Sequence, residues 1–118
     1  MARVLVGMTK PNVPEKAVQA QCEQLLDYGR WTWTHFTTSM SVRGRYLTAF
    51  SGRRGFPDIV AVRAKDQRVL FIECKGTRGR LDSDQKHWRD EIKRMVLGVE
   101  YHLVGPDDID PHMMEVLA

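Results

Sequence analysis

The sequence predicts a mixed α/β fold in which one β-sheet is flanked by helices. Two observations predict it. Apolar residues recur at helical spacing over residues 14–28 and again over 83–97, and two short apolar segments, 58–63 and 68–75, stand on either side of a turn. With a further strand on each side of this pattern, the expected order of elements is α-β-β-β-α-β.

The chain length limits the number of domains. Its 118 residues are enough for one hydrophobic core and too few for two. We therefore expect a single domain over residues 1–118, in which residues 1–13, with Pro11 and Asn12, form a loose lead-in.

The first half of the chain provides one helix and one strand. The helix is expected to begin at Pro14, which suits the first helical position, and to end at Tyr28, before a stop at Gly29. Its apolar stripe consists of Val18, Cys22, Leu25 and Leu26. Residues 30–39 are rich in aromatic and β-branched side chains, which favours a strand. The Gly- and Arg-rich residues 41–56 are expected to be a connection that contains a short strand or turn.

The second half of the chain follows the hairpin with a helix and a strand. The helix is expected over residues 83–97 and should end at Gly98. Its apolar stripe consists of Trp88, Ile92, Met95 and Val96. A strand follows at residues 100–104, and residues 105–118 are expected to form a turn and a short helix.

The charge of the chain is unevenly distributed. Residues 43–80 hold ten Lys and Arg against three acidic residues, a net charge of +7, whereas the rest holds eight against twelve, a net charge of −4. This asymmetry favours an anionic partner that binds at one place on the surface.

Two features indicate a cytoplasmic protein without membrane contact. No apolar run approaches the length of a membrane span, and the first ten residues hold too short an apolar run for a signal peptide. Cys22 and Cys74 show no CxxC or CxxH spacing, so we expect buried free thiols in place of a disulfide or a zinc site.

Three charged residues stand in the apolar hairpin, in "PDIVAVRAKDQRVLFIECK". Side chains two apart on a strand share a face, so Glu73 and Lys75 point the same way while Cys74 points into the apolar layer. Asp58 begins the first strand of the hairpin and should lie beside the Glu73 end of the second. Two carboxylates and an ammonium group therefore converge at one end of the sheet.

Such a cluster suits a hard cation. Neighbouring carboxylates repel each other, and an oxygen-preferring divalent ion such as Mg²⁺ removes that repulsion. Lys75 would then orient or deprotonate a water, or neutralise charge that develops on a phosphate. Metal-assisted hydrolysis of a phosphodiester fits this set. The alternative from spacing alone is a Glu73–Lys75 salt bridge on a solvent-facing surface.

The motif around these residues resembles a known nuclease signature. Fourteen residues separate the Asp of "PD" from the Glu of "ECK", as in PD-(D/E)XK nucleases, and "GFPDIVAV…VLFIECKGTRGRLDSDQKHW" resembles the VRR-NUC (virus-type replication-repair nuclease) family. The match runs from Gly55 to Trp88 and covers most of the chain when the flanking helix and strand are included. The resemblance implies a PD-(D/E)XK restriction-endonuclease-like α/β core.

The resemblance also implies roles for individual residues. Asp58 and Glu73 would bind the metal together with the backbone carbonyl of Cys74, and Lys75 would position the attacking water. Gln85 matches a further motif of the family. The alternative for Gln85 is a capping box with Asp82 that serves only the start of the helix.

The family also uses a glutamate from its first helix. Glu15 is the first choice, because it lies on the same helix stripe as Val18 and Cys22. The competitor is Glu23, which lies beside Leu26. Either residue could instead be an ordinary solvated helix residue, and the helix dipole would favour Glu15 at that position in any case.

Basic and aromatic residues flank the motif. The arginines expected to hold a DNA backbone are Arg43, Arg45, Arg53, Arg54, Arg78 and Arg80. Trp31, Trp33 and Phe36 could stack on bases, but their place in a strand favours the core. The four histidines are scattered, which argues against a zinc-dependent nuclease.

Together these features predict a DNA endonuclease that depends on Mg²⁺ or Mn²⁺ and acts in the cytoplasm of a bacterial or phage-infected cell. Similarity to short members of the family implies a homodimer that cuts branched, Holliday-junction-like DNA, with no small-molecule cofactor. The competing predictions are a nuclease of ordinary duplex DNA and a DNA-binding module of the same fold without catalysis.

Overall fold

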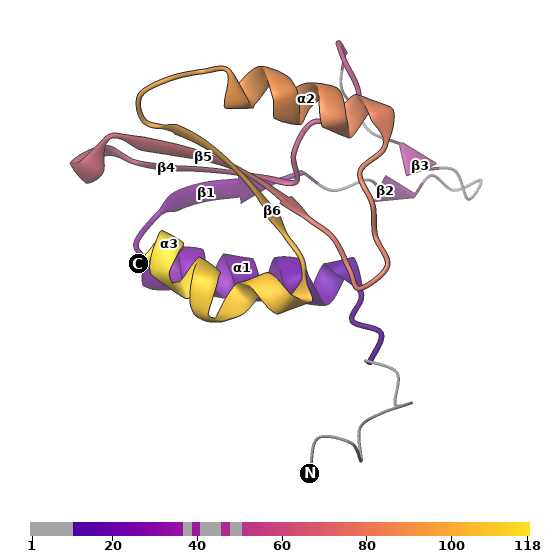
Figure 1. The fold of residues 1–118 in the computed structure, drawn as a ribbon, viewed down its shortest axis with the longest axis horizontal. Coiled ribbons are helices and arrows are strands. Elements are labelled where there is room, and N and C mark those ends of the chain that lie inside the picture. Colours follow the sequence, from indigo (N-terminus) through magenta and orange to yellow (C-terminus); the bar gives the residue numbers. More distant parts are fainter. Residues whose placement is uncertain (1–10, 37–38, 41–45, 48–50) are drawn as a thin grey trace.

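The computed structural model of the protein describes residues 11–36, 39–40, 46–47 and 51–118. Its helices and sheet form three layers (Figure 1). Helix α2 (Ser83–Lys93) covers one face of the sheet, and α1 (Glu15–Tyr28) and α3 (Met114–Leu117) cover the other. The predicted mixed α/β sheet with flanking helices is confirmed.

The main sheet has four strands in the order β1-β4-β5-β6. Their bounds are Thr32–His35 for β1, Ile59–Arg63 for β4, Arg68–Cys74 for β5 and Val99–Val104 for β6. β4 pairs antiparallel with both β1 and β5, while β6 runs parallel to β5. A one-turn 3₁₀ helix, Ala64–Asp66, closes the predicted hairpin between β4 and β5.

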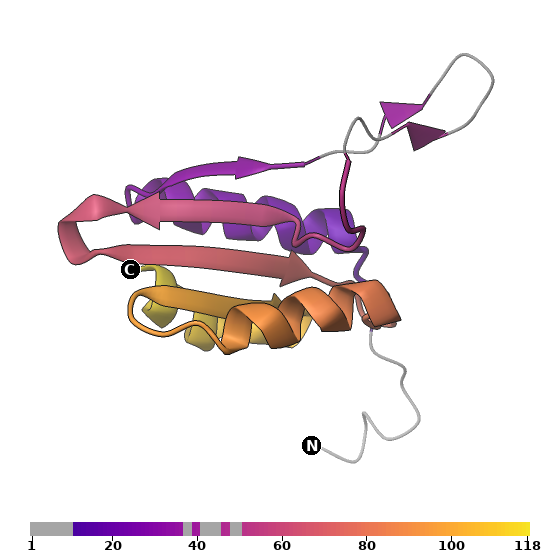
Figure 2. The ribbon, with the colours of Figure 1, turned by 90° about the horizontal axis from the view of Figure 1, so that it is seen from above.

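The two faces of this sheet are covered unequally. Seen from above, α2 lies over β6 at one edge, whereas no helix covers β1 and β4 from that side (Figure 2). The short strands β2 (Ser39–Met40) and β3 (Tyr46–Leu47) form a separate antiparallel ribbon that projects beyond the sheet. Of these two strands, β3 lies within residues 41–56, where a short strand or turn was expected.

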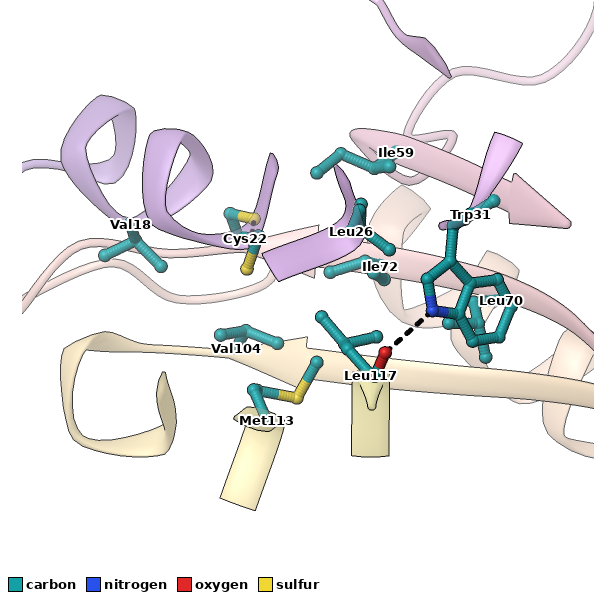
Figure 3. Packing of buried hydrophobic residues seen from close by; sticks show 12 residues of the cluster. Val18, Cys22, Leu26, Trp31, Ile59, Leu70, Ile72, Val104, Met113 and Leu117 are labelled. Carbon is teal, nitrogen blue, oxygen red and sulfur yellow. Dashed lines mark hydrogen bonds between the residues drawn. The ribbon is translucent and has the colours of Figure 1, made fainter. Parts of the chain in front are cut away.

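The core lies between the sheet and the α1–α3 layer (Figure 3). The apolar stripe of α1 is fully buried there at Val18, Cys22 and Leu26. Trp31 is also buried, and its indole Nε1 donates a hydrogen bond to the carbonyl oxygen of Leu117 at 2.9 Å. The prediction that Trp31 belongs to the core is confirmed.

The two cysteines are free and buried, as expected. Although 52 positions separate them in sequence, the Sγ atoms of Cys22 and Cys74 lie 4.0 Å apart. They join α1 to the inner face of β5 within the core, so Cys74 points away from the face that carries its charged neighbours.

Gly29 follows the last residue of α1, as expected, but it does not adopt the left-handed conformation for which glycine is favoured at a helix end. Its φ is −79°, and the left-handed residue is Arg30, with φ of 60°. A Cβ on Gly29 would collide with the carbonyl oxygen of Leu117. The glycine therefore permits close approach of the C-terminal segment.

Helix α2 is shorter than predicted. It ends at Lys93 instead of residue 97, and Met95, Val96 and Leu97 are exposed to solvent. The chain has to turn back here to enter β6, which is fixed by a hydrogen bond from the Val69 N–H to the Gly98 carbonyl. The predicted continuation of the apolar stripe through Met95 and Val96 is wrong.

Val13, at the end of the expected lead-in, is bonded to the loop that follows β5. The N–H of Thr77 donates to the Val13 carbonyl at 2.9 Å, and the N–H of Val13 donates to the Thr77 hydroxyl at 2.8 Å. These bonds fix the entry to α1 against the loop that follows β5.

The C-terminal segment begins with helical turns at Pro106–Asp108 and Ile109–Met113 and continues into α3. Met113 and Leu117 bury their side chains against α1 and the sheet (Figure 3). No helix in the described residues has the length and apolar character that crossing a membrane requires.

Candidate active site

The hairpin register brings the predicted carboxylates together. Ile59 pairs with Ile72, so the next positions outward, Asp58 and Glu73, face each other at the end of the two strands. Glu15, at the start of α1, reaches the same place. One carboxylate oxygen from each of the three lies within 4.8 Å of the other two.

Backbone hydrogen bonds fix Asp58 in this cluster. Its Oδ2 accepts a hydrogen bond from the N–H of Cys74 at 2.8 Å, and its carbonyl oxygen accepts one from the N–H of Phe36 at 3.1 Å. The buried Pro57 directly before it restrains the approach of the chain. Asp58 is therefore held from both neighbouring strands.

Lys75 is the positive charge of the site. Its Nζ lies 3.6 Å from Glu73 Oε2 and 3.8 Å from Glu15 Oε1, and it donates a hydrogen bond to Gln85 Oε1 at 3.1 Å. Since Lys75 is half-buried, these contacts are more than a solvated surface pair. The cluster extends well beyond the simple Glu73–Lys75 salt bridge that spacing alone allowed.

Gln85 combines the two roles that the sequence left as alternatives. Its N–H donates to Asp82 Oδ1 at 2.8 Å and its Oε1 accepts from the Asp82 N–H at 2.9 Å, which is a capping box. The same side chain accepts from Lys75 and donates through Nε2 to Glu73 Oε2 at 3.3 Å. The cap thus fixes an amide that bridges the lysine and the glutamate.

Glu73 is unusual because its carboxyl group is buried with few polar partners. Arg63 and Glu73 are the two buried charged residues in the part of the chain that the structure describes. Arg63 forms two hydrogen bonds to Asp66 and one each to the carbonyls of Gly29 and Ala118. Glu73, only 2% exposed, has an amide at 3.3 Å and an amine at 3.6 Å.

Burial therefore dominates the protonation of Glu73. It raises the pKa of Glu73 from 4.5 to about 8, with a further contribution from the negative charge of Asp58, while Lys75 acts in the opposite direction. Burial and Asp58 also raise the pKa of Glu15. The cluster without a cation holds a proton near neutral pH, which a cation can replace.

The structure separates the two candidate helix glutamates. Glu15 joins the cluster, whereas the carboxylate of Glu23 lies 2.8 Å from the imidazole Nδ1 of His35. Glu23 also accepts a hydrogen bond from Gln19 at 3.1 Å. Geometry thus places Glu15, and not Glu23, with Asp58 and Glu73.

Two glycines allow the elements around the cluster to meet. A Cβ on Gly76 would come within 2.6 Å of the Val13 carbonyl oxygen and 2.8 Å of the Glu15 nitrogen. Gly55, with φ of +87°, packs on the backbone of Asp84 and Gln85 at the start of α2. Both glycines let backbone segments approach closely enough to deliver Glu15 and Gln85 to the site.

Four of the six predicted DNA-binding arginines fall in the described residues. Arg53 and Arg54 are exposed in the segment that leads to Asp58, and Arg53 lies 3.4 Å from Asp84. Arg78 and Arg80 are exposed in the loop between Lys75 and α2. Both pairs border the site end of the sheet. Arg43 and Arg45 lie outside the described residues.

Sequence reasoning missed Tyr101 on β6. Tyr101 pairs with Phe71, two residues before Glu73 on the neighbouring strand, and its buried hydroxyl has no hydrogen-bond partner in the described part of the chain. Burial raises the pKa of Tyr101 to about 12, and the charge of Glu73 adds to the effect. No sequence signal marks it, because alternation gives the face of a residue and not the partners of its hydroxyl.

The buried Tyr101 hydroxyl leads to a stability prediction. Tyr101→Phe is expected to be neutral or to stabilise the protein by up to about 1 kcal/mol, because it removes a desolvated donor without breaking a protein hydrogen bond. Urea unfolding checks this, with Tyr28→Phe at an 88% exposed position as the control. A loss above about 1 kcal/mol for Tyr101→Phe would show that the hydroxyl has a partner, such as a bound water.

A mixed sheet with Asp58 and a Glu-x-Lys strand end beneath a capped helix defines a nuclease domain of the PD-(D/E)XK type. A family model described as the VRR-NUC domain matches residues 40–105, more than half of the chain. The chain therefore belongs to the VRR-NUC family, as its motif suggested, and is a nuclease with DNA as its substrate. Comparisons with curated proteins and with solved structures gave no significant match.

The matched residues include Asp58, Glu73, Lys75 and Gln85 but begin only after α1. The inclusion of Glu15 in the cluster therefore depends on the three-dimensional structure and on the first-helix glutamate that the family resemblance implies.

Proposed function

We propose that the protein is an endonuclease that hydrolyses DNA phosphodiesters with a divalent cation held by Glu15, Asp58 and Glu73. The observation that carries the proposal is the convergence of three carboxylates, one of which belongs to the buried Glu73. An all-oxygen set of this kind matches the preference of Mg²⁺ or Mn²⁺. The Cys74 carbonyl, directly after Glu73, is proposed as a further ligand.

The cation would act as a Lewis acid that neutralises charge on the scissile phosphate. The other functions belong to the chain itself. Lys75, held by its hydrogen bond to Gln85, is placed to orient the attacking water and to stabilise negative charge at phosphorus. Gln85 also donates a hydrogen bond to Glu73, so this side chain holds Lys75 and Glu73 in position relative to each other.

Hydrolysis is then a displacement at phosphorus. The water oxygen forms a bond to phosphorus, one P–O ester bond breaks, and the water proton is released while the departing oxygen takes one up. We propose that the phosphates on either side of the cut are held by the exposed arginines Arg53, Arg54, Arg78 and Arg80. Arg43 and Arg45 remain proposed for the same role on the basis of the sequence alone.

Branched DNA and a homodimer are the finer part of the proposal. Both are supported by similarity to short family members that act as junction resolvases, and the net charge of +7 over residues 43–80 supports DNA binding. The free thiols Cys22 and Cys74 suit a reducing compartment, so we propose that the enzyme acts in the cytoplasm, as a single domain over residues 1–118.

The competing proposals differ in substrate or in catalysis. A nuclease of ordinary duplex DNA would use the same site. A binding module without catalysis is disfavoured, because three clustered carboxylates repel phosphate and add nothing to binding alone.

The assay that tests the proposal compares a labelled four-way junction, the matched duplex and a single strand, each with Mg²⁺, Mn²⁺ or EDTA. We expect cleavage in either metal, none in EDTA, and the highest kcat/KM on the junction. Asp58→Asn should abolish the cleavage. Equal cleavage of junction and duplex would exclude the preference for branched DNA, and tight binding without cutting under either metal would overturn the catalytic proposal.

A further inference from the structure

Phe36 is exposed beside the site, although its place in an aromatic strand favoured the core. The side chain is 57% exposed, whereas Trp31 in the same segment is buried. Leaving a phenyl ring in water forgoes the hydrophobic stabilisation that burial would give. A single exposed apolar side chain is ordinary on a protein surface, so the case for a ligand at Phe36 rests on what surrounds it.

The backbone ties Phe36 to the carboxylate cluster. Its N–H donates to the carbonyl oxygen of Asp58 at 3.1 Å, directly beyond the pairing of His35 with Ile59. The two residues therefore lie on neighbouring strands, which are about 5 Å apart in a sheet. Because His35 faces Glu23 of α1, strand alternation places Phe36 on the opposite face, which α2 only partly covers.

An aromatic cluster supports the ring from behind. Phe36 meets Phe56 edge to face, with ring centroids 5.5 Å apart and an interplanar angle of 81°. Phe56 in turn contacts Phe71 of β5 at 5.9 Å and Trp88 of α2 at 4.9 Å, both edge to face. The Trp88 indole is fixed by a hydrogen bond to the Arg54 carbonyl at 2.8 Å.

This contact geometry leaves Phe36 with a π-face that Phe56 does not use. In an edge-to-face pair, one ring uses an edge and the other uses one of its two faces. Whichever part Phe36 plays, at least one of its faces is not used by Phe56. Phe56 itself is 37% exposed, so the two rings extend the surface together.

The charges around the two rings suit a nucleotide. Arg53 and Arg54 are exposed just before Phe56 in sequence, and the Arg54 backbone is bonded to the same aromatic cluster. A phosphate held at these arginines, or at a cation bound by the carboxylate cluster, would place its own base within reach of an adjacent aromatic ring.

We propose that Phe36, supported by Phe56, stacks on an unstacked nucleobase of DNA whose phosphate would be held by a cation at the Glu15–Asp58–Glu73 cluster. Bases within a continuous duplex are already stacked on both sides. Phe36 therefore gains a partner where stacking is interrupted, at a junction, a bulge or a single-stranded end. The inference rests on the proposed function, because it takes DNA to be bound at that cluster.

The test uses the fluorescent adenine analogue 2-aminopurine, whose emission falls when it stacks on an aromatic ring. The analogue is placed in turn at each position around the unpaired base of a bulged duplex, and the DNA is titrated with the protein in Ca²⁺. Phe36→Leu keeps an apolar side chain of similar size, and Phe36→Tyr keeps the aromatic ring. Tyr28→Leu, an exposed aromatic at the far end of α1, is the matched control.

We expect the wild type, Phe36→Tyr and Tyr28→Leu to quench 2-aminopurine at one position beside the bulge. Phe36→Leu should lose the quenching and bind the bulged DNA about 5- to 150-fold more weakly, while its affinity for unbroken duplex changes less than about twofold. Quenching and affinity of Phe36→Leu equal to the wild type would overturn the proposal. So would an equal loss on duplex and bulged DNA, which indicates a structural role.

Failure of the stacking proposal can be told from failure of the nuclease proposal. A wild type that cuts DNA together with a Phe36→Leu variant that still quenches would remove the stacking role and leave the nuclease. A wild type that cuts nothing in Mg²⁺ or Mn²⁺ would remove the proposed activity, and the quenching in Ca²⁺ would still decide whether Phe36 stacks on a base.

Discussion

Glu73→Gln is expected to reduce the rate of DNA cleavage by about 10²- to 10³-fold or more, without unfolding the protein. Glutamine has nearly the same size and can keep a hydrogen bond to Gln85. It lacks the negative charge that a divalent cation needs at the centre of the cluster. Single-turnover cleavage with saturating protein measures the effect on the chemical step apart from DNA binding.

Two substitutions in α1 provide matched controls for this result. Glu15→Gln changes a residue of the cluster and should also lower the rate, whereas Glu23→Gln changes a carboxylate paired with His35 and should leave it within about twofold. The reverse outcome would make Glu23 the helix-borne acid of the reaction. Full activity of Glu73→Gln would contradict the metal site altogether.

The second large effect expected is a coupling between metal binding and protons. Burial and the neighbouring Asp58 raise the pKa of Glu73 to about 8, so the cluster without metal carries a proton at pH 7. A bound cation requires the ionised carboxylate. Binding of Mg²⁺ should therefore release about one proton, and its apparent affinity should rise up to about tenfold per pH unit between pH 6 and 8.

The ionisation of Glu73 should also make the free energy of unfolding of the metal-free protein depend on pH. The folded-state pKa of Glu73 lies above its ordinary value of 4.5, so the folded protein binds more protons than the unfolded chain between about pH 4.5 and 8. The free energy of unfolding should consequently fall as pH rises through this window. The contribution of Glu73 to stability is fully present below its pKa in the unfolded chain and is lost above its pKa in the folded protein.

Isothermal titration calorimetry with Mg²⁺ at pH 7, in two buffers of different ionisation enthalpy, counts the protons released. Urea unfolding in EDTA from pH 5 to 8.5 follows the stability, and Glu73→Gln should remove most of its dependence on pH in this window. Equal Mg²⁺ affinity at pH 6 and pH 8 with no proton release would contradict the coupling. Such a result would mean that Glu73 is already ionised in the metal-free protein.

The local order of the sequence determined the hairpin and its charged end. A strand period of two and a short turn fix the pairing of residues 58–63 with 68–75, so Asp58 had to meet Glu73. The capping box of Asp82 and Gln85 was likewise visible, because it spans one helical turn. These features need only contacts between residues near in the chain, and the match to the VRR-NUC domain covers all of them.

The tertiary structure decided what depends on how the layers pack. Periodicity gave α1 a buried face but left Glu15 and Glu23 as alternatives, because the end of the helix that meets Asp58 is set by packing on the sheet. Alternation gave Phe36 a face of its strand but not its exposure, since α2 covers β6 and leaves β1 open. Contacts between distant segments follow from the packing of whole elements, which local patterns do not encode.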